Sequence, residues 1–213
     1  MFTRTQLLYD EATRVIVYLI FDGPRAQLPE VSEDLAYYIY AGEAPDSFGP
    51  DNVLDHMLTP DYRIVKRDAE YAGEMPRLRL LSAKCSAMWK VFDGVSFRRR
   101  PYTKNLPFQG EIYGLKEREA RKFKREHAEA QGNGGAIPEA GAYPFLKSYA
   151  ALYHMEPIDV AELVLLKARE RTKALQVTEH MRLYWTQKVA EAKSLEEVDR
   201  VSKQMVEERF RLN

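Results

Sequence analysis

Two short apolar runs open the chain, with a polar turn between them. Residues 3–9 and 13–21 are rich in Leu, Val, Ile, Tyr and Thr, and Asp10, Glu11 and Ala12 separate them. Because β-branched and aromatic residues favour strands, this pattern predicts a β-hairpin. The second run contains the segment VIVYLIF, which is apolar on both of its faces, and it therefore predicts a central strand.

Proline and glycine interrupt the chain between residues 28 and 60, and only short elements fit between them. Residues 35–40 (LAYYIY) are compatible with a strand or with one helical turn. Residues 52–58 predict a short helix, and the alternating residues 62–67 predict a half-buried strand. Residues 78–92 contain apolar residues throughout and are compatible with a strand followed by a helix. The N-terminal part is therefore expected to be an irregular mixed domain.

A different pattern begins near Gly114. Residues 115–130 consist mostly of charged residues and alanine, so they predict a helix, and Phe123 is its one clear apolar stripe position. Residues 131–144 concentrate Gly, Ala and Pro, as linkers do. The expected organisation is a mixed domain over residues 1–130, a linker over residues 131–144 and a helical module over residues 145–213.

Capping signals divide the C-terminal module into helices. Residues 145–155 predict an amphipathic helix that stops before Pro157. Asp159, with Glu162 three positions later, predicts the start of a long helix over residues 160–193. The sequence Ser194-Leu195-Glu196-Glu197 is a second capping box and predicts a closing helix to about residue 209. The break between these helices is short, which implies an antiparallel or sharply angled pair. The expected fold class is α+β.

Composition restricts the class of protein. The chain has 213 residues, 45% of them apolar and 30% charged, which is ordinary for a globular protein. Its net charge of zero disfavours a globally basic nucleic-acid binder. The apolar start is interrupted by Asp10, Glu11 and Arg14, and the longest apolar run is too short to span a bilayer. We therefore expect no signal peptide and no membrane insertion.

Candidate catalytic chemistry is sparse. The four histidines lie far apart in the sequence, and Cys85 is the only cysteine and has apolar neighbours, which predicts a buried, inert thiol. An enzyme would require a pocket that brings His56 together with the carboxylates of residues 43–55, and a solvated loop is the favoured interpretation of those carboxylates. We predict no catalytic residue, no metal site and no cofactor.

A basic segment is the strongest charge feature. Residues 98–125 carry ten Lys and Arg side chains against three Glu side chains. Interleaved aromatic residues suit stacking on bases, while basic side chains suit phosphates. The candidate nucleic-acid-binding residues are Arg98, Arg99, Arg100, Arg121, Lys122, Lys124 and Arg125. The competing interpretation is a charged helix that contacts acidic surfaces of the same protein or of a neighbour, because pairs such as Glu117 and Arg121 have helical i,i+4 spacing.

Residues 160–201 read VAELVLLKARERTKALQVTEHMRLYWTQKVAEAKSLEEVDRV. This segment resembles the C-terminal helical segment of small tail proteins of tailed bacteriophages, in which a long helix, a Ser-Leu-Glu-Glu break and a closing helix follow one another. The resemblance covers about a fifth of the chain. It implies a virion component or assembly factor of the tail, baseplate or neck, located in the virion or the host cytoplasm, with no catalytic residues to carry over.

These observations together predict a non-enzymatic structural or assembly protein that binds other virion subunits or itself. The exposed centre of the long helix, residues 167–173, is either a solvated face or an arm that packs on a neighbouring subunit. Aromatic and arginine side chains are typical anchors of protein interfaces. The candidate partner-binding residues are Trp185, Tyr184, Arg169 and Arg171, and the competing interpretation of the aromatic ones is that they are core residues. Nucleic-acid binding by the basic segment is the alternative function.

Overall fold

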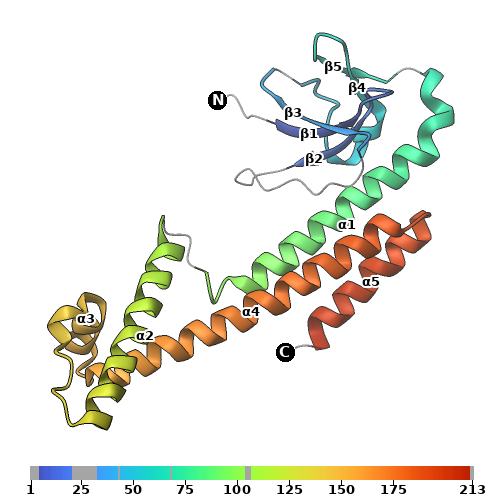
Figure 1. The fold of residues 1–213 in the computed structure, drawn as a ribbon. Coiled ribbons are helices and arrows are strands. Elements are labelled where there is room, and N and C mark those ends of the chain that lie inside the picture. Colours follow the sequence, from blue (N-terminus) through green and yellow to red (C-terminus); the bar gives the residue numbers. More distant parts are fainter. Residues whose placement is uncertain (1–4, 21–32, 43, 68, 104–106, 212–213) are drawn as a thin grey trace. The chain divides into compact units, whose positions relative to one another are not determined.

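The computed structural model describes residues 5–20, 33–42, 44–67, 69–103 and 107–211, and its fold is α+β (Figure 1). A small antiparallel sheet region forms the N-terminal part and helices form most of the rest, which confirms the predicted class. The chain divides into two compact units. Unit 1 contains residues 1–95 and 181–213, and unit 2 contains residues 96–180. The predicted linker over residues 131–144 therefore lies inside unit 2.

The predicted β-hairpin is confirmed in unit 1. Strand β1 (Thr5–Asp10) pairs antiparallel with β2 (Ile16–Ile20), and residues 35–40 form a third strand, β3 (Leu35–Tyr40). The strand order is β2-β1-β3. The prediction that the second apolar run is the central strand is wrong, because β1 is central and β2 lies at an edge of this sheet.

Both faces of strand β2 are apolar, and each face packs in a different buried cluster. Leu8 pairs with Tyr18 and Tyr9 pairs with Ile16, so Val17 is an extra residue in a β-bulge. Ile16 then points into one apolar cluster with Tyr9, while Val17 points into another with Leu8. Two-sided burial therefore reflects two layers packed on the sheet rather than a central position in it.

The segment after β3 differs in part from its prediction. A 3-10 helix over Pro50–Asp55 is followed by β4 (His56–Leu58), which pairs with β5 (Ile64–Lys66). The predicted helix over residues 52–58 is therefore wrong in its second half, whereas the predicted strand over residues 62–67 is confirmed at its centre. Arg14 attaches this hairpin to the sheet, because its guanidinium donates to the carbonyls of Leu58 at 2.9 Å and Thr59 at 2.8 Å.

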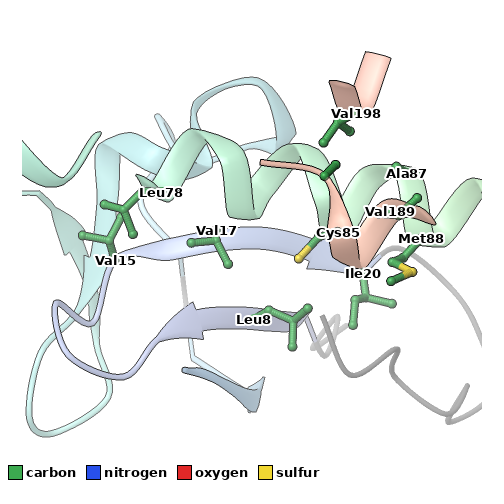
Figure 2. Packing of buried hydrophobic residues seen from close by; sticks show 11 residues of the cluster. Leu8, Val15, Val17, Ile20, Leu78, Cys85, Ala87, Met88, Val189 and Val198 are labelled. Atoms are coloured by element: carbon green, nitrogen blue, oxygen red, sulfur yellow. The ribbon is translucent and has the colours of Figure 1, made fainter. Parts of the chain in front are cut away.

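A single helix, α1 (Met75–Arg99), replaces the strand and helix predicted over residues 78–92. Leu78, Leu81, Cys85 and Met88 are buried, and their spacing of three or four residues places them on one helical face. In unit 1 this face packs on β1 and β2, together with Val189 and Val198 (Figure 2).

The end of α4 (Pro157–Glu191) and the closing helix α5 (Leu195–Arg211) complete unit 1. Val189 and Val198 both lie in the cluster on the sheet, so the two helices pack against each other across the short break. Ser194 Oγ accepts the Glu197 backbone N–H at 3.2 Å, as predicted for an N-cap. The Glu197 carboxylate accepts the backbone N–H of Lys193, one residue before the cap. Both predicted helices are confirmed.

Unit 2 contains α2 (Gln109–Asn133), a 3-10 turn over Ala140–Ala142, α3 (Pro144–Tyr153) and the first part of α4. The helices predicted over residues 115–130 and 145–155 are confirmed, and α2 extends further in both directions. The capping box predicted at Asp159 and Glu162 is wrong. Helix α4 begins at Pro157, Asp159 lies in its first turn, and Glu162 forms an ion pair with Lys124 at 2.8 Å.

The core of unit 2 is small. Its buried cluster consists of Ala120, Phe123, Tyr143, Leu146, Val160 and Ala161. The rings of Phe123 and Tyr143 meet edge to face with centroids 5.0 Å apart. Tyr143 is near the end of the predicted linker, so the end of that segment is part of the core that joins α2 to α3. A hydrogen bond from the Leu146 N–H to Glu119 Oε1, at 2.8 Å, adds a polar link between the same helices.

Candidate partner-binding surface

The four predicted partner-binding residues are divided between the two units. In unit 1, the Trp185 side chain is only 3% exposed and packs with Val91 and Val95, so it has the core role that was its competing interpretation. Tyr184 is exposed, and its ring contacts that of Trp185 edge to face. In unit 2, Arg169 lies on the exposed surface of α4, and the Arg171 guanidinium covers the Tyr113 ring at 4.8 Å.

Five of the seven candidate residues of the basic segment have a carboxylate partner within unit 2. Arg99 binds Glu179 at 2.9 Å and also donates to Thr178 Oγ1 at 2.8 Å. The four candidates on α2 pair with glutamates as well. Arg121 pairs with Glu117, Lys122 with Glu126, Lys124 with Glu162 and Arg125 with Glu129. This pattern is the one expected of a charged helix whose charges are balanced by the same protein.

The remaining basic candidates lie at the end of α1, Arg98 in its last turn and Arg100 just after it. Arg98 is half-buried, whereas Arg100 is exposed and stacks over the Phe97 ring at 5.6 Å. Cations in the last turn of a helix also interact favourably with its macrodipole. These arginines therefore have a local structural role in addition to any ligand that they bind.

The candidate enzyme site does not assemble around His56 among the described residues. His56 is buried, its Nδ1 lies 3.0 Å from the Asn52 carbonyl oxygen, and its Nε2 lies 3.4 Å from Ser47 Oγ. Its ring also contacts Phe48 edge to face. Glu43 lies outside the described residues. These neighbours give His56 a structural role in the turn before β4.

Cys85 is buried in the sheet-facing side of α1, and this burial raises the pKa of its thiol to about 12. A thiol with so high a pKa is a poor nucleophile near neutral pH. The described residues also contain no group of three His, Cys, Asp or Glu side chains that could hold a metal ion.

One buried carboxylate, that of Asp10, lies where the hairpin meets the start of α1. Its oxygens accept hydrogen bonds from the N–H and hydroxyl of Thr13, at 3.0 and 2.7 Å, and from two nitrogens of Arg77, at 2.8 and 3.0 Å. Burial raises the pKa of Asp10, but these hydrogen bonds outweigh that effect and hold the pKa below its usual value. Every strong interaction of Asp10 is internal, which indicates a structural role.

One side of α3 carries a row of apolar and aromatic side chains, which are half-buried at Phe145 and Tyr149 and exposed at Leu152 and Tyr153. Phe145, Tyr149, Leu152 and Tyr153 have the spacing i, i+4, i+7 and i+8, so they lie along one side of the helix. The rings of Tyr149 and Tyr153 are 5.5 Å apart. Leu152 is 67% exposed and Tyr153 is 53% exposed. We name these four residues the α3 patch.

Lys116 of α2 lies at one end of the α3 patch. Its ammonium group is 4.5 Å from the centre of the Tyr149 ring and 5.8 Å from that of Phe145, and it donates to the Tyr149 hydroxyl. Cation–π contacts of this kind hold a charge against aromatic faces. The patch is therefore apolar and aromatic along α3, with a positive charge beside it.

The α3 patch was not predicted from the sequence. Residues 145–155 were correctly predicted to be amphipathic, and Leu146, Tyr149, Ala150 and Met155 contact the core. The sequence signal for the patch is the width of the apolar side of this helix. Phe145, Leu152 and Tyr153 extend the apolar side beyond the part that packs on the core.

No described helix is both long enough and apolar enough to cross a membrane. Comparison with models of protein families, with curated proteins and with solved structures found no match to this chain.

Proposed function

We propose that this chain is a non-enzymatic structural or assembly protein of a tailed-phage virion, in the tail, baseplate or neck, and that it acts through protein–protein contacts made by unit 2. The observation that carries the proposal is the balance of buried and exposed apolar side chains in unit 2. Among the described residues of that unit, six apolar residues are buried, whereas nine large apolar side chains are exposed.

Unit 1 provides the comparison. Its described residues include 23 buried apolar residues and six large apolar side chains that are exposed. A smaller unit always buries a smaller fraction of its surface, so part of this contrast reflects size. Scattered exposed apolar residues are also normal. The α3 patch is different because its aromatic side chains are adjacent, and adjacent aromatic side chains are typical of interface centres.

The charges of α2 support protein partners over nucleic acid. A phosphate backbone is bound by basic side chains that can exchange their counterions for phosphates. Arg121, Lys122, Lys124 and Arg125 each have a glutamate partner, and a phosphate would have to displace that carboxylate. The resemblance of residues 160–201 to phage tail proteins is the reason for proposing a virion as the assembly.

Cross-linking in infected cells that express a tagged chain tests this function. Lysine-reactive cross-links should join Lys116, Lys147 and Lys167 of unit 2 to virion proteins or to other copies of the chain. Lys66 on β5 and Lys90 on α1 serve as the internal control in unit 1, and they should give fewer intermolecular links. Cross-links confined to single chains, or recovery of the chain mainly as a nucleic-acid complex that dissociates with salt, would reject the proposal.

A further inference from the structure

The two units carry opposite net charge. Residues 96–180 contain fifteen Lys and Arg residues and eleven Asp and Glu residues, whereas residues 1–95 and 181–213 together contain seventeen and twenty-one. Unit 2 is therefore positive by four charges and unit 1 is negative by four. Two copies that meet through identical faces of unit 2 would bring like charges together, whereas a contact between unit 2 of one copy and unit 1 of another would bring opposite charges together.

Helix α5 of unit 1 offers a surface that complements the α3 patch. Residues 195–208 contain five acidic and two basic side chains. Leu195, Asp199 and Val206 are exposed and have the spacing i, i+4 and i+11, which places them on one side of the helix. We name these three residues the α5 face.

The two surfaces also agree in length. From Phe145 to Tyr153, α3 rises roughly 12 Å, and from Leu195 to Val206, α5 rises roughly 16 Å. Each surface places apolar side chains along two to three helical turns. The α3 patch has Lys116 at one end. On α5, Asp199 is paired with Lys203 at 2.6 Å, so the negative charge beside the α5 face comes from the exposed Glu196 and Glu207.

We propose that the α3 patch of one copy binds the α5 face of a second copy, so that the chain assembles head to tail. This inference rests on the proposed function and names its partner as the same chain. A head-to-tail contact uses two different surfaces, so each copy keeps one surface available for the next copy, and the assembly grows into a ring or a filament. Such growth suits a repeated component of a tail or neck.

Two single substitutions test the two surfaces separately. Leu152→Glu places a charge in the α3 patch, and Val206→Arg places a positive charge in the α5 face. Both positions are exposed, so each variant should fold like the wild type. Size-exclusion chromatography with light scattering over a dilution series should give wild-type masses above the 24.7 kDa of one chain. Each variant should self-associate at least about tenfold more weakly.

Each substitution has a matched control on the same helix. Ala151 is exposed on the side of α3 away from the patch, and Gln204 is exposed on the side of α5 away from its face. Ala151→Glu and Gln204→Arg introduce the same charges one or two positions away. Both control variants should self-associate like the wild type.

Mixing the two variants gives the decisive measurement. The Leu152→Glu chain retains an intact α5 face, and the Val206→Arg chain retains an intact α3 patch. Their equimolar mixture should therefore form a dimer of twice the chain mass, while neither variant alone does so and no larger species grows.

A wild-type chain that is monomeric over the whole series would overturn the proposal, as would control variants that lose association equally. A Val206→Arg chain that still self-associates like the wild type would instead indicate contact between identical patches, which also overturns it. None of these outcomes removes the proposed function, since cross-links to other virion proteins in cells would remain. Absence of both self-association and cross-links would remove both.

Discussion

The ion pair between Asp10 and Arg77 should be a major contributor to the stability of unit 1. The Asp10 side chain is 0% exposed, and four donors surround its two oxygens. In an Asp10→Asn variant, one oxygen becomes an NH2 group, which would point at a donor instead of accepting from it. The substitution also leaves the Arg77 guanidinium without its buried counterion.

The expected loss can be bounded from the exposure of Arg77. Breaking a buried ion pair by removing one partner costs about 3–5 kcal/mol. The Arg77 side chain is 39% exposed and also binds Glu74 at 2.9 Å, so water and Glu74 partly compensate its charge. We therefore expect Asp10→Asn to lower the free energy of unfolding by about 3 kcal/mol, the low end of that range. Glu74→Gln is the control, because an exposed pair contributes less than about 1 kcal/mol.

Tryptophan fluorescence is a suitable assay because both tryptophans of the chain, Trp89 and Trp185, belong to unit 1. With a urea dependence of about 2–3 kcal/mol per molar, a loss of 3 kcal/mol lowers the unfolding midpoint by about 1 M or slightly more. A loss below about 1 kcal/mol, or an equal loss in Glu74→Gln, would refute this account of the pair.

The same pair fixes a pH dependence. The folded-state pKa of Asp10 lies below the ordinary value of 3.8, so its stabilising contribution is complete above pH 3.8 and is lost as the pH falls through the folded pKa. Wild type and Asp10→Asn should therefore converge in stability at acid pH. A difference between them that stays constant from neutral pH to well below 3.8 would show that ionisation of Asp10 is not the source.

Three further predictions concern other parts of the chain. Phe123→Ala should destabilise unit 2 by about 3–5 kcal/mol, seen as faster amide hydrogen exchange in α2 and α3, and unchanged exchange there would contradict the core role of Phe123. Ser194→Ala should lower the free energy of unfolding of unit 1 by about 1 kcal/mol in urea titrations, through loss of the α5 cap; no loss would mean that the cap contributes nothing. The Cys85 thiol should resist Ellman's reagent at pH 8 until urea is added, and stoichiometric labelling of the native chain would show that it is not buried.

The sequence by itself determined those helices and strands that are specified by residues close to one another along the chain. The apolar start, rich in β-branched and aromatic residues, predicted strands β1 and β2 with their turn, and the charged, alanine-rich segment around Phe123 predicted the centre of α2. Ser194 and Glu197 located the start of α5 because a cap is formed by residues within one helical turn. The capping box at Asp159 failed since Glu162 has a better partner in Lys124, which lies 38 positions away.

Tertiary structure alone decided which faces are covered and by what. Periodicity indicates which faces of a strand are apolar. Two apolar faces on β2 give the same pattern whether the strand lies at the centre or at an edge of the sheet, because in both positions each face can be covered by a separate layer. The same limit applies to charge, because the basic segment is balanced by carboxylates as distant as Glu179, which is 80 positions from Arg99. It also applies to α3, whose apolar arc is wider than its core contact. Leu146, Tyr149 and Ala150 pack on the core of unit 2, and this packing leaves Leu152 and Tyr153 exposed.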